Sequence, residues 1–251
     1  MKLLGSDFDG TFSYGGIDER KLEAVRRWRR AGNKFGIISG RGVDFYEALR
    51  QRYTELEFDF LAACNGGYIV DFRGNLIFES RCRDISAQKL TEELLARGGI
   101  CAHIINDRHL CVATSEEALP TNLPAENTYL FSNFPSLDFF YQVSVPTENP
   151  ERASEVVPFI RDAYGEKLTP LQNGRTVDIV PKGVNKAQGL YRLMEHYGCN
   201  YDDVIAVGDQ INDMDMIREF HSYAMENGLE KIKAVANGIV SSVTELLETL
   251  L

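Results

Sequence analysis

Cysteine and histidine are scarce in this chain. Its five cysteines are widely scattered over 251 residues and form no CxxC pair: Cys64, Cys82, Cys101, Cys111 and Cys199. A disulfide framework is not expected in a chain of this size, so buried or free thiols are the simpler interpretation. The four histidines show neither an HExxH motif nor another paired spacing of metal ligands. We therefore do not expect a structural zinc site.

Long hydrophobic runs and an excess of basic charge are absent as well. No stretch approaches the ~20 apolar residues of a membrane span, and Asp7 comes too early for a signal peptide, so we expect a cytoplasmic protein without a membrane partner. The 27 basic and 37 acidic residues give a net charge of −10, which argues against broad nucleic-acid binding. With 44% hydrophobic and 25% charged residues, the chain is typical of globular proteins.

The apolar pattern alternates between short strands and amphipathic helices at both ends of the chain. Strands are predicted at 1–6, 35–38, 58–63, 203–208 and 221–225, and helices at 18–31, 43–53, 185–197, 214–220, 229–235 and 243–251. Such alternation with short connections predicts an α/β fold with a parallel, Rossmann-like sheet and right-handed crossovers.

The middle of the chain has a different, α+β pattern. After a hairpin at 68–78, helices are predicted at 86–97 and 150–164, and strands at 102–105, 110–114, 139–145, 167–171 and 176–180. We therefore expect a catalytic core formed by residues 1–80 and 183–251, with a second domain inserted at 81–182.

Polar residues gather where the predicted core strands end, and ligands of open parallel sheets bind at that edge. The strand ends carry Asp7-Phe8-Asp9, Ser39-Gly40-Arg41, Asn65-Gly66 and Gly208-Asp209-Gln210-Ile211-Asn212-Asp213, and Lys186 opens the helix that returns from the insert. Four aspartates close together would repel one another. A hard divalent cation, Mg²⁺ by its preference for oxygen ligands, relieves that repulsion.

The spacing of Asp7 and Asp9 suits phosphoryl transfer. Side chains at i and i+2 of an extended strand point the same way, so one carboxylate can attack phosphorus while the other moves protons. Lys186, at a helix N-terminus, and the Ser39 hydroxyl can hold phosphoryl oxygens.

Four segments together resemble the motifs of the haloacid dehalogenase-like (HAD) superfamily. They are DFDGT at 7–11, SGR at 39–41, the lysine of GVNKAQGL at 186, and GDQINDMDM at 208–216. The resemblance implies that Asp7 is the nucleophile, Asp9 the acid/base and Lys186 a further catalytic residue. It implies Mg²⁺ bound by the Asp7 carboxylate, the Asp9 carbonyl and Asp209, with Asp213 orienting a metal-bound water or Lys186. The implied phosphate ligands are Ser39, Gly40, Lys186, Asn212 and the backbone N–H groups of Phe8 and Asp9, with Arg41 as a further substrate-binding candidate.

The place of the insert narrows the resemblance to one subgroup. Only eight residues separate Asp9 from the helix cap Asp18, which leaves no room for a cap domain there. The insert lies instead between Ser39 and Lys186, as in the Cof-type (subclass IIB) phosphatases with a C2-type α+β cap. That likeness implies sugar phosphates or related small phosphorylated metabolites as substrates.

The leading hypothesis is thus a Mg²⁺-dependent phosphomonoesterase that forms an aspartyl-phosphate. A phosphosugar mutase could use the same aspartate pair and would return the phosphoryl group to a sugar rather than to water. A receiver-like signalling module combines similar residues, but the insert and Asp9 argue against it. A dehalogenase is disfavoured because it has no need of an acid/base at Asp9.

Overall fold

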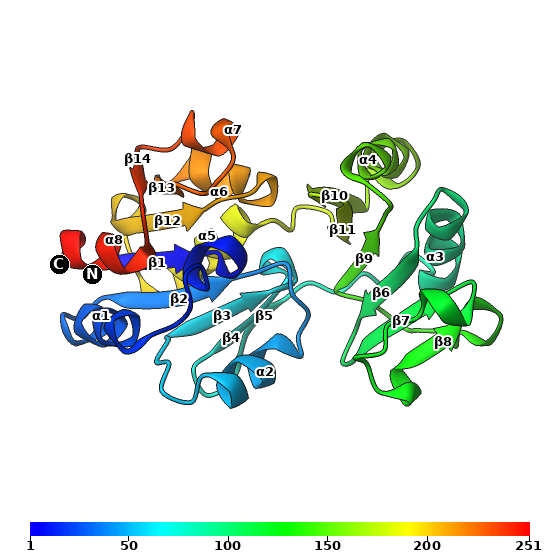
Figure 1. Cartoon of the computed structure of the whole chain (residues 1–251), viewed down its shortest axis with the longest axis horizontal. Helices are drawn as coiled ribbons and strands as arrows, with labels where there is room; N and C mark the ends of the chain where they lie inside the picture. The colour runs from blue at the N-terminus through cyan, green and yellow to red at the C-terminus, as the bar shows by residue number, and fades with distance from the viewer. The chain divides into compact units, whose positions relative to one another are not determined.

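The computed structural model describes all residues from 1 to 251, and the chain divides into two compact units (Figure 1). The core unit comprises Met1–Gly40, Phe45–Phe78 and Asn185–Leu251. The inserted unit comprises Arg41–Asp44 and Glu79–Val184. The short segment Arg41–Asp44 thus belongs to the inserted unit, although it follows directly on the second core strand.

An eight-stranded sheet forms the centre of the core unit, in the order β14-β13-β12-β1-β2-β3-β4-β5. Its strands are β1 (Leu3–Ser6), β2 (Lys34–Ile38), β3 (Phe60–Ala63), β4 (Tyr68–Asp71), β5 (Leu76–Glu79), β12 (Val204–Gly208), β13 (His221–Met225) and β14 (Gly238–Val240). All pairs from β14 to β3 are parallel, and β4 joins antiparallel to β3. The predicted parallel sheet is confirmed, and the ends of β1, β2, β3 and β12 share one edge.

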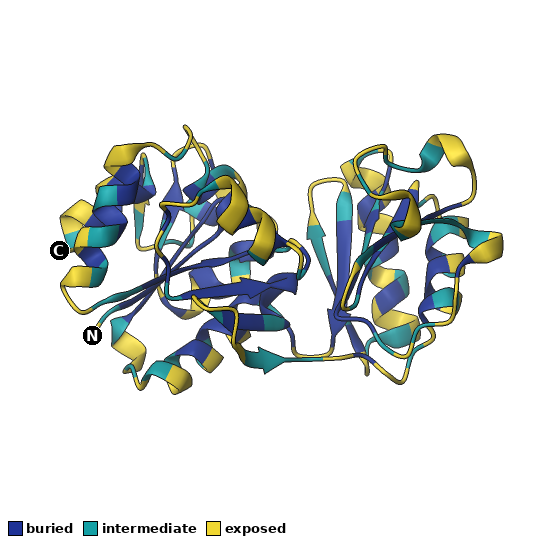
Figure 2. Cartoon of the chain, turned by 90° about the horizontal axis from the view of Figure 1, so that it is seen from below, coloured by how far each residue is buried: buried dark blue, intermediate teal, exposed yellow.

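Helices cover both faces of this sheet, which makes three layers. They are α1 (Glu19–Arg30), α2 (Phe45–Arg52), α5 (Lys186–Tyr197), α6 (Met214–Glu219), α7 (Glu230–Lys233) and α8 (Val243–Leu250). Side chains alternate along β1, so Leu4 packs with α1, α2 and α8 while Leu3 packs with α5, α6 and α7. Figure 2 shows the result, buried strands between helices that are exposed on their outer faces.

The inserted unit has two layers. Its sheet runs β10-β11-β9-β6-β7-β8 and is antiparallel except for β7 and β8. The strands are β6 (Cys101–Ile105), β7 (His109–Ala113), β8 (Thr128–Leu130), β9 (Gln142–Pro146), β10 (Leu168–Asn173) and β11 (Thr176–Pro181). One face packs against α3 (Ala87–Ala96) and α4 (Pro150–Tyr164) around an apolar core, so the insert is an α+β unit.

Several element boundaries differ from the sequence prediction. The strand predicted at 139–145 begins at Gln142, because Phe140 makes only an isolated bridge to Cys82. The helix predicted at 229–235 shortens to Glu230–Lys233, and β8 and β14, of three residues each, were not predicted. None of the helices combines the length and the apolar character that crossing a membrane requires.

Candidate active site

The ends of neighbouring strands bring the motif residues of the core unit together. Asp7 follows β1, and its N–H extends the ladder by donating to the carbonyl of Val207 in β12. Asp209 follows β12 directly. Carboxylate oxygens of Asp7, Asp209 and Asp213 therefore lie within 4.8 Å of one another, and all three residues are buried.

Lys186 is the cation of this cluster. Its ammonium donates to Asp7 Oδ1 at 2.6 Å and to Asp213 Oδ1 at 2.5 Å, and the residue has no exposed surface. It opens α5, whose first turn is capped by Asn185. Gly66 lets the turn after β3 approach that helix, because a Cβ there would lie 2.8 Å from the Asn185 carbonyl oxygen.

Asp213 holds its own turn as well as Lys186. Its Oδ2 accepts from the backbone N–H groups of Asp209 and Gln210, at 2.9 Å each. One oxygen of this carboxylate thus caps its own turn while the other contacts Lys186. Since both oxygens are engaged, Asp213 fits a positioning role better than direct ligation of a metal ion.

Burial and like charge raise the pKa values of two acids of the cluster, Asp7 and Asp209. Burial raises the pKa of Asp7 well above its usual value; the Lys186 charge opposes this shift and Asp213 adds to it. The pKa of Asp209 is also raised, mainly by burial, against the hydrogen bond from Thr11. Burial alone would lower the pKa of Lys186, but the two carboxylates beside it raise the value, so the lysine stays charged.

The turn after β1 carries Asp9. Asp9 has an exposed side chain and an extended backbone (φ −79°, ψ 120°), and Gly10 follows with φ 80°. A Cβ on Gly10 would lie 2.5 Å from Asp209 Oδ2, so only glycine allows this turn to lie against that carboxylate. Phe8 is buried, with its ring 4.9 Å from the ring of Phe45.

The predicted phosphate and substrate ligands differ from one another in burial and in hydrogen bonding. Ser39 is buried at the end of β2, where its carbonyl accepts from the N–H of Asn65, and Gly40 follows it. Asn212 is 8% exposed, and its Oδ1 has no hydrogen-bond partner in the protein. Arg41 belongs to the inserted unit, so it is not part of the cluster within the core unit.

Two residues that support the site were not predicted from the sequence. Thr11, within DFDGT, donates its hydroxyl to Asp209 Oδ1 at 2.7 Å. Lys21, 4% exposed, donates to the carbonyls of Phe12, Tyr14 and Gly16 at 2.6–2.9 Å. Thr11 could have been found from its place in the motif, whereas a lysine on an amphipathic helix gives no such signal.

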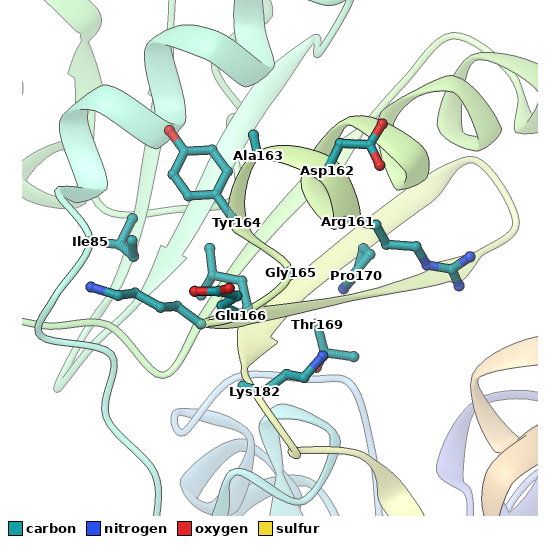
Figure 3. A pocket seen from close by; sticks show the side chains of 12 residues that line it. Ile85, Arg161, Asp162, Ala163, Tyr164, Gly165, Glu166, Thr169, Pro170 and Lys182 are labelled. Carbon is teal, nitrogen blue, oxygen red and sulfur yellow. The ribbon is translucent and has the colours of Figure 1, made fainter.

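A hollow lies elsewhere, in the inserted unit (Figure 3). Its volume is about 780 Å³, and its lining mixes basic Arg161, Lys167 and Lys182 with acidic Asp162 and Glu166. None of the motif residues lines it. The carboxylate cluster, and not this hollow, is therefore the candidate active site.

The fold and the cluster define a class: an α/β protein with paired acids and a buried lysine at the carboxyl edge of a parallel sheet. The sequence matches the family described as haloacid dehalogenase-like hydrolase over residues 4–246. The chain belongs to this family of hydrolases.

Curated relatives match over nearly the whole chain. The 5-amino-6-(5-phospho-D-ribitylamino)uracil phosphatase YbjI of Escherichia coli is 28% identical over 94% of this chain and 89% of its own. The phosphatase YwtE of Bacillus subtilis, named for the same substrate, is 26% identical over 98% of this chain and 94% of its own. The pyridoxal phosphate phosphatase YbhA of E. coli is 25% identical over 97% of this chain and 94% of its own.

Solved structures share the fold. A haloacid dehalogenase-like hydrolase from B. subtilis superposes with a TM-score of 0.81 at 19% identity, covering 100% of both chains. The HAD subclass IIB sugar phosphatase BT4131 has a TM-score of 0.77 at 19% identity, covering 100% of this chain and 99% of that one. The predicted fold class is thereby confirmed.

Proposed function

We propose that this protein is a Mg²⁺-dependent phosphatase that hydrolyses phosphomonoesters of small metabolites through a phosphoryl group carried on Asp7. One observation supports this most strongly: a buried ammonium bridges Asp7 and Asp213 beside a third carboxylate, Asp209. Family membership and the phosphatase names of the relatives point to the same reaction.

The donor set fits a hard divalent cation. Three carboxylates face one ammonium, so two negative charges are uncompensated when all three are ionised. Every donor is oxygen, as Mg²⁺ prefers. The partnerless Oδ1 of Asn212 supplies a further buried polar atom beside the Asp213 turn. Asp7, the Asp9 carbonyl and Asp209 would hold the ion, which when bound neutralises charge on the transferring phosphoryl group.

Asp7 is the proposed nucleophile. Lys186 holds its Oδ1, which fixes the orientation of the carboxylate and keeps a positive charge where phosphate oxygens gather. A carboxylate oxygen attacks phosphorus, the bond from phosphorus to the ester oxygen breaks, and the alkoxide departs. An aspartyl-phosphate remains on Asp7.

Asp9 is the proposed acid and base. Its side chain is exposed at the turn that follows Asp7, so it can reach both the leaving oxygen and a water molecule. It donates a proton to the leaving alkoxide and then takes one from the water that attacks the aspartyl-phosphate. Inorganic phosphate leaves, and both carboxylates return to their starting state.

Ser39, Gly40, Asn212 and the backbone N–H groups of Phe8 and Asp9 are the proposed phosphate ligands, with Arg41 as an additional contact. Asp213 positions Lys186 and the Asp209 turn. The inserted unit, residues 81–182 in the sequence-based division, is proposed to act as a C2-type cap that excludes water from the reacting groups. We further propose that the protein works in the cytoplasm, with a small phosphorylated metabolite as its partner.

A substrate screen tests the function. Purified protein with Mg²⁺ is assayed for phosphate release from sugar phosphates, nucleotides, pyridoxal phosphate and 5-amino-6-(5-phospho-D-ribitylamino)uracil. We expect turnover of at least one ester, its loss on chelation and its return with Mg²⁺. Transfer of the phosphoryl group to a second sugar hydroxyl instead of water would favour a mutase, and activity unaffected by chelation would contradict the metal assignment.

A further inference from the structure

The inserted unit contains a second cluster of chemically active side chains, on the hairpin of β6 and β7. Cys101 and His103 stand two residues apart on β6, so their side chains share one face of the sheet. Cys111 of β7 lies directly opposite His103 in the antiparallel register. Cross-strand partners point to the same face, so the pairing brings two sulfur atoms and one imidazole together.

The ligand atoms of these three residues already have the spacing of a soft-metal site. One atom from each lies within 4.8 Å of the other two, and Cys101 Sγ is 3.5 Å from His103 Nε2. Zinc bonds of about 2.3 Å to sulfur and 2.0 Å to nitrogen place two such ligands about 3.5 Å apart at a tetrahedral angle. Because the three ligand atoms already lie this close together, the site needs little rearrangement to bind an ion. Cys101 and Cys111 are both buried.

A chain of hydrogen bonds fixes which nitrogen of His103 carries its proton. Asp44 Oδ2, an acceptor when ionised, lies 3.2 Å from His109 Nδ1, which therefore carries the proton. His109 Nε2 is then an acceptor and lies 3.0 Å from His103 Nδ1. In neutral His103 the proton is on Nδ1, so Nε2 presents its lone pair toward the cysteines. Metal-binding histidines characteristically donate the N–H of their other ring nitrogen to a hydrogen-bond acceptor.

A disulfide explains the two cysteines less well. Cys101 pairs in register with Ala113, so Cys111 is its diagonal neighbour across the hairpin. Diagonal residues lie about 7–8 Å apart at Cα, whereas disulfides usually join Cα atoms closer than about 7 Å. Sulfur atoms that converge on an imidazole suit a shared ion better than a bond between them.

We propose that Cys101, His103 and Cys111 bind a zinc ion. The hydrogen-bond chain through His109 to Asp44 orients His103 for this role. Thiolate and imidazole ligands select zinc over Mg²⁺. Binding releases the thiol protons of Cys101 and Cys111 to the solvent. The fourth position of the ion is left for water or an outside ligand. Because Asp44 lies in the segment Arg41–Asp44, the site ties that segment to the β6–β7 hairpin. The site shares no residue with the carboxylate cluster and does not depend on the proposed phosphatase reaction.

No zinc motif is apparent along the chain because the ligands come from two paired strands. C-A-H at 101–103 and H-L-C at 109–111 are mirror images in sequence, which only the hairpin register aligns. Nearby Ala118, Leu119 and Leu123 pack against Cys101, Cys111 and Ala113. This apolar cover limits the access of water and would strengthen metal binding.

Cobalt provides a direct test in the full-length, reduced protein with saturating Mg²⁺. Bound Co²⁺ should give thiolate-to-metal charge-transfer absorption and the intense d–d bands of tetrahedral coordination, saturating at one equivalent and bleached by Zn²⁺. Cobalt at the oxygen-only carboxylate cluster gives no charge-transfer band, so Asp209→Asn should leave the spectrum unchanged. A wild-type protein that shows no charge-transfer band overturns the proposal without recourse to any variant.

Variants then assign the ligands. Cys101→Ser and Cys111→Ser should each abolish the band, whereas Cys199→Ser, at a partly exposed cysteine outside the cluster, should keep it. Asp44→Asn should weaken zinc binding about 10–100-fold, as outer-layer partners do, with circular dichroism as the check on folding. Undiminished zinc stoichiometry in the double variant of Cys101 and Cys111 would refute the assignment.

Discussion

The core unit and the inserted unit each gather polar side chains at one place in a sheet, but with opposite chemistry. The core cluster offers only oxygen ligands and one lysine, at the carboxyl edge of parallel strands. The cluster of the inserted unit offers sulfur and nitrogen, on the face of an antiparallel hairpin. The first suits a hard cation and phosphate, and the second suits zinc.

The difference also lies in how each cluster is encoded. Asp7 and Asp9, or Asp209 and Asp213, are close in the chain and follow strands directly, so short motifs reveal them. Cys101 and Cys111 come together only through a particular strand register. If the comparison holds, changes in the core cluster abolish turnover and leave thiolate–cobalt absorption intact.

The largest expected effect comes from Asp7→Asn. An amide cannot form the aspartyl-phosphate, so turnover of p-nitrophenyl phosphate should fall by on the order of 10⁴-fold or more. The measurement is steady-state release of nitrophenol, with cobalt absorption in the inserted unit as the matched check on integrity. Substantial activity in this variant would remove Asp7 from its proposed role.

Asp9→Asn should slow the reaction less, and unequally. Loss of a positioned acid costs typically 10²–10⁴-fold, and the loss should be greatest for alkyl phosphates, whose leaving groups need a proton. Comparing kcat/KM for an alkyl ester and for p-nitrophenyl phosphate measures the inequality. An equal loss on both esters would argue against proton donation by Asp9.

Lys21→Met tests the stability of the core unit alone. The variant leaves the carbonyls of Phe12, Tyr14 and Gly16 without their donor, the first buried and the other two partly buried, which should lower the free energy of unfolding by about 2–4 kcal/mol. Hydrogen exchange resolved by segment should show faster exchange in β1 and α1, with β6 and β7 unchanged. Lys231→Met, at an exposed lysine of α7, serves as control, and equal behaviour of the two variants would count against a structural role for Lys21.

Thr11→Val is expected to have the smallest effect. It removes one hydrogen bond to Asp209, of the kind worth about 1.5–3 kcal/mol when the partner is charged, and should weaken Mg²⁺ activation about tenfold or more. Thr11→Ser keeps the hydroxyl and should restore most of the affinity. If valine and serine give the same Mg²⁺ dependence, the hydroxyl does not support the site.

The sequence predicted those parts of the fold that local patterns determine. Helix α1 was found because Asp18 caps it, as the bond from Lys21 N to Asp18 Oδ1 confirms, and β1 because an apolar run precedes Asp7. Strands β8 and β14 were not predicted because three residues are too few to show a periodic pattern. Asp7, Lys186, Asp209 and Asp213 were predicted to meet because parallel strands end at one edge, and the structure brings them together.

What the sequence could not supply were contacts made by register or by burial. The Thr11–Asp209 bond joins residues far apart in the chain, and Lys21 lies buried on a helix whose arginine side chains suggest a solvated face. The sequence likewise could not show that the two oxygens of Asp213 have different partners. One accepts from Lys186, and the other accepts from the backbone of its own turn.

Trapping the phosphorylated enzyme tests the central claim most directly. Asp9→Asn protein is mixed with p-nitrophenyl phosphate and Mg²⁺, quenched rapidly in acid, and its peptides are mapped by mass spectrometry. The account predicts one phosphoryl group on Asp7, absent when Asp7→Asn is added to the variant. A phosphoryl group on another residue, or phosphate release with no phosphorylated peptide at any time, would contradict it.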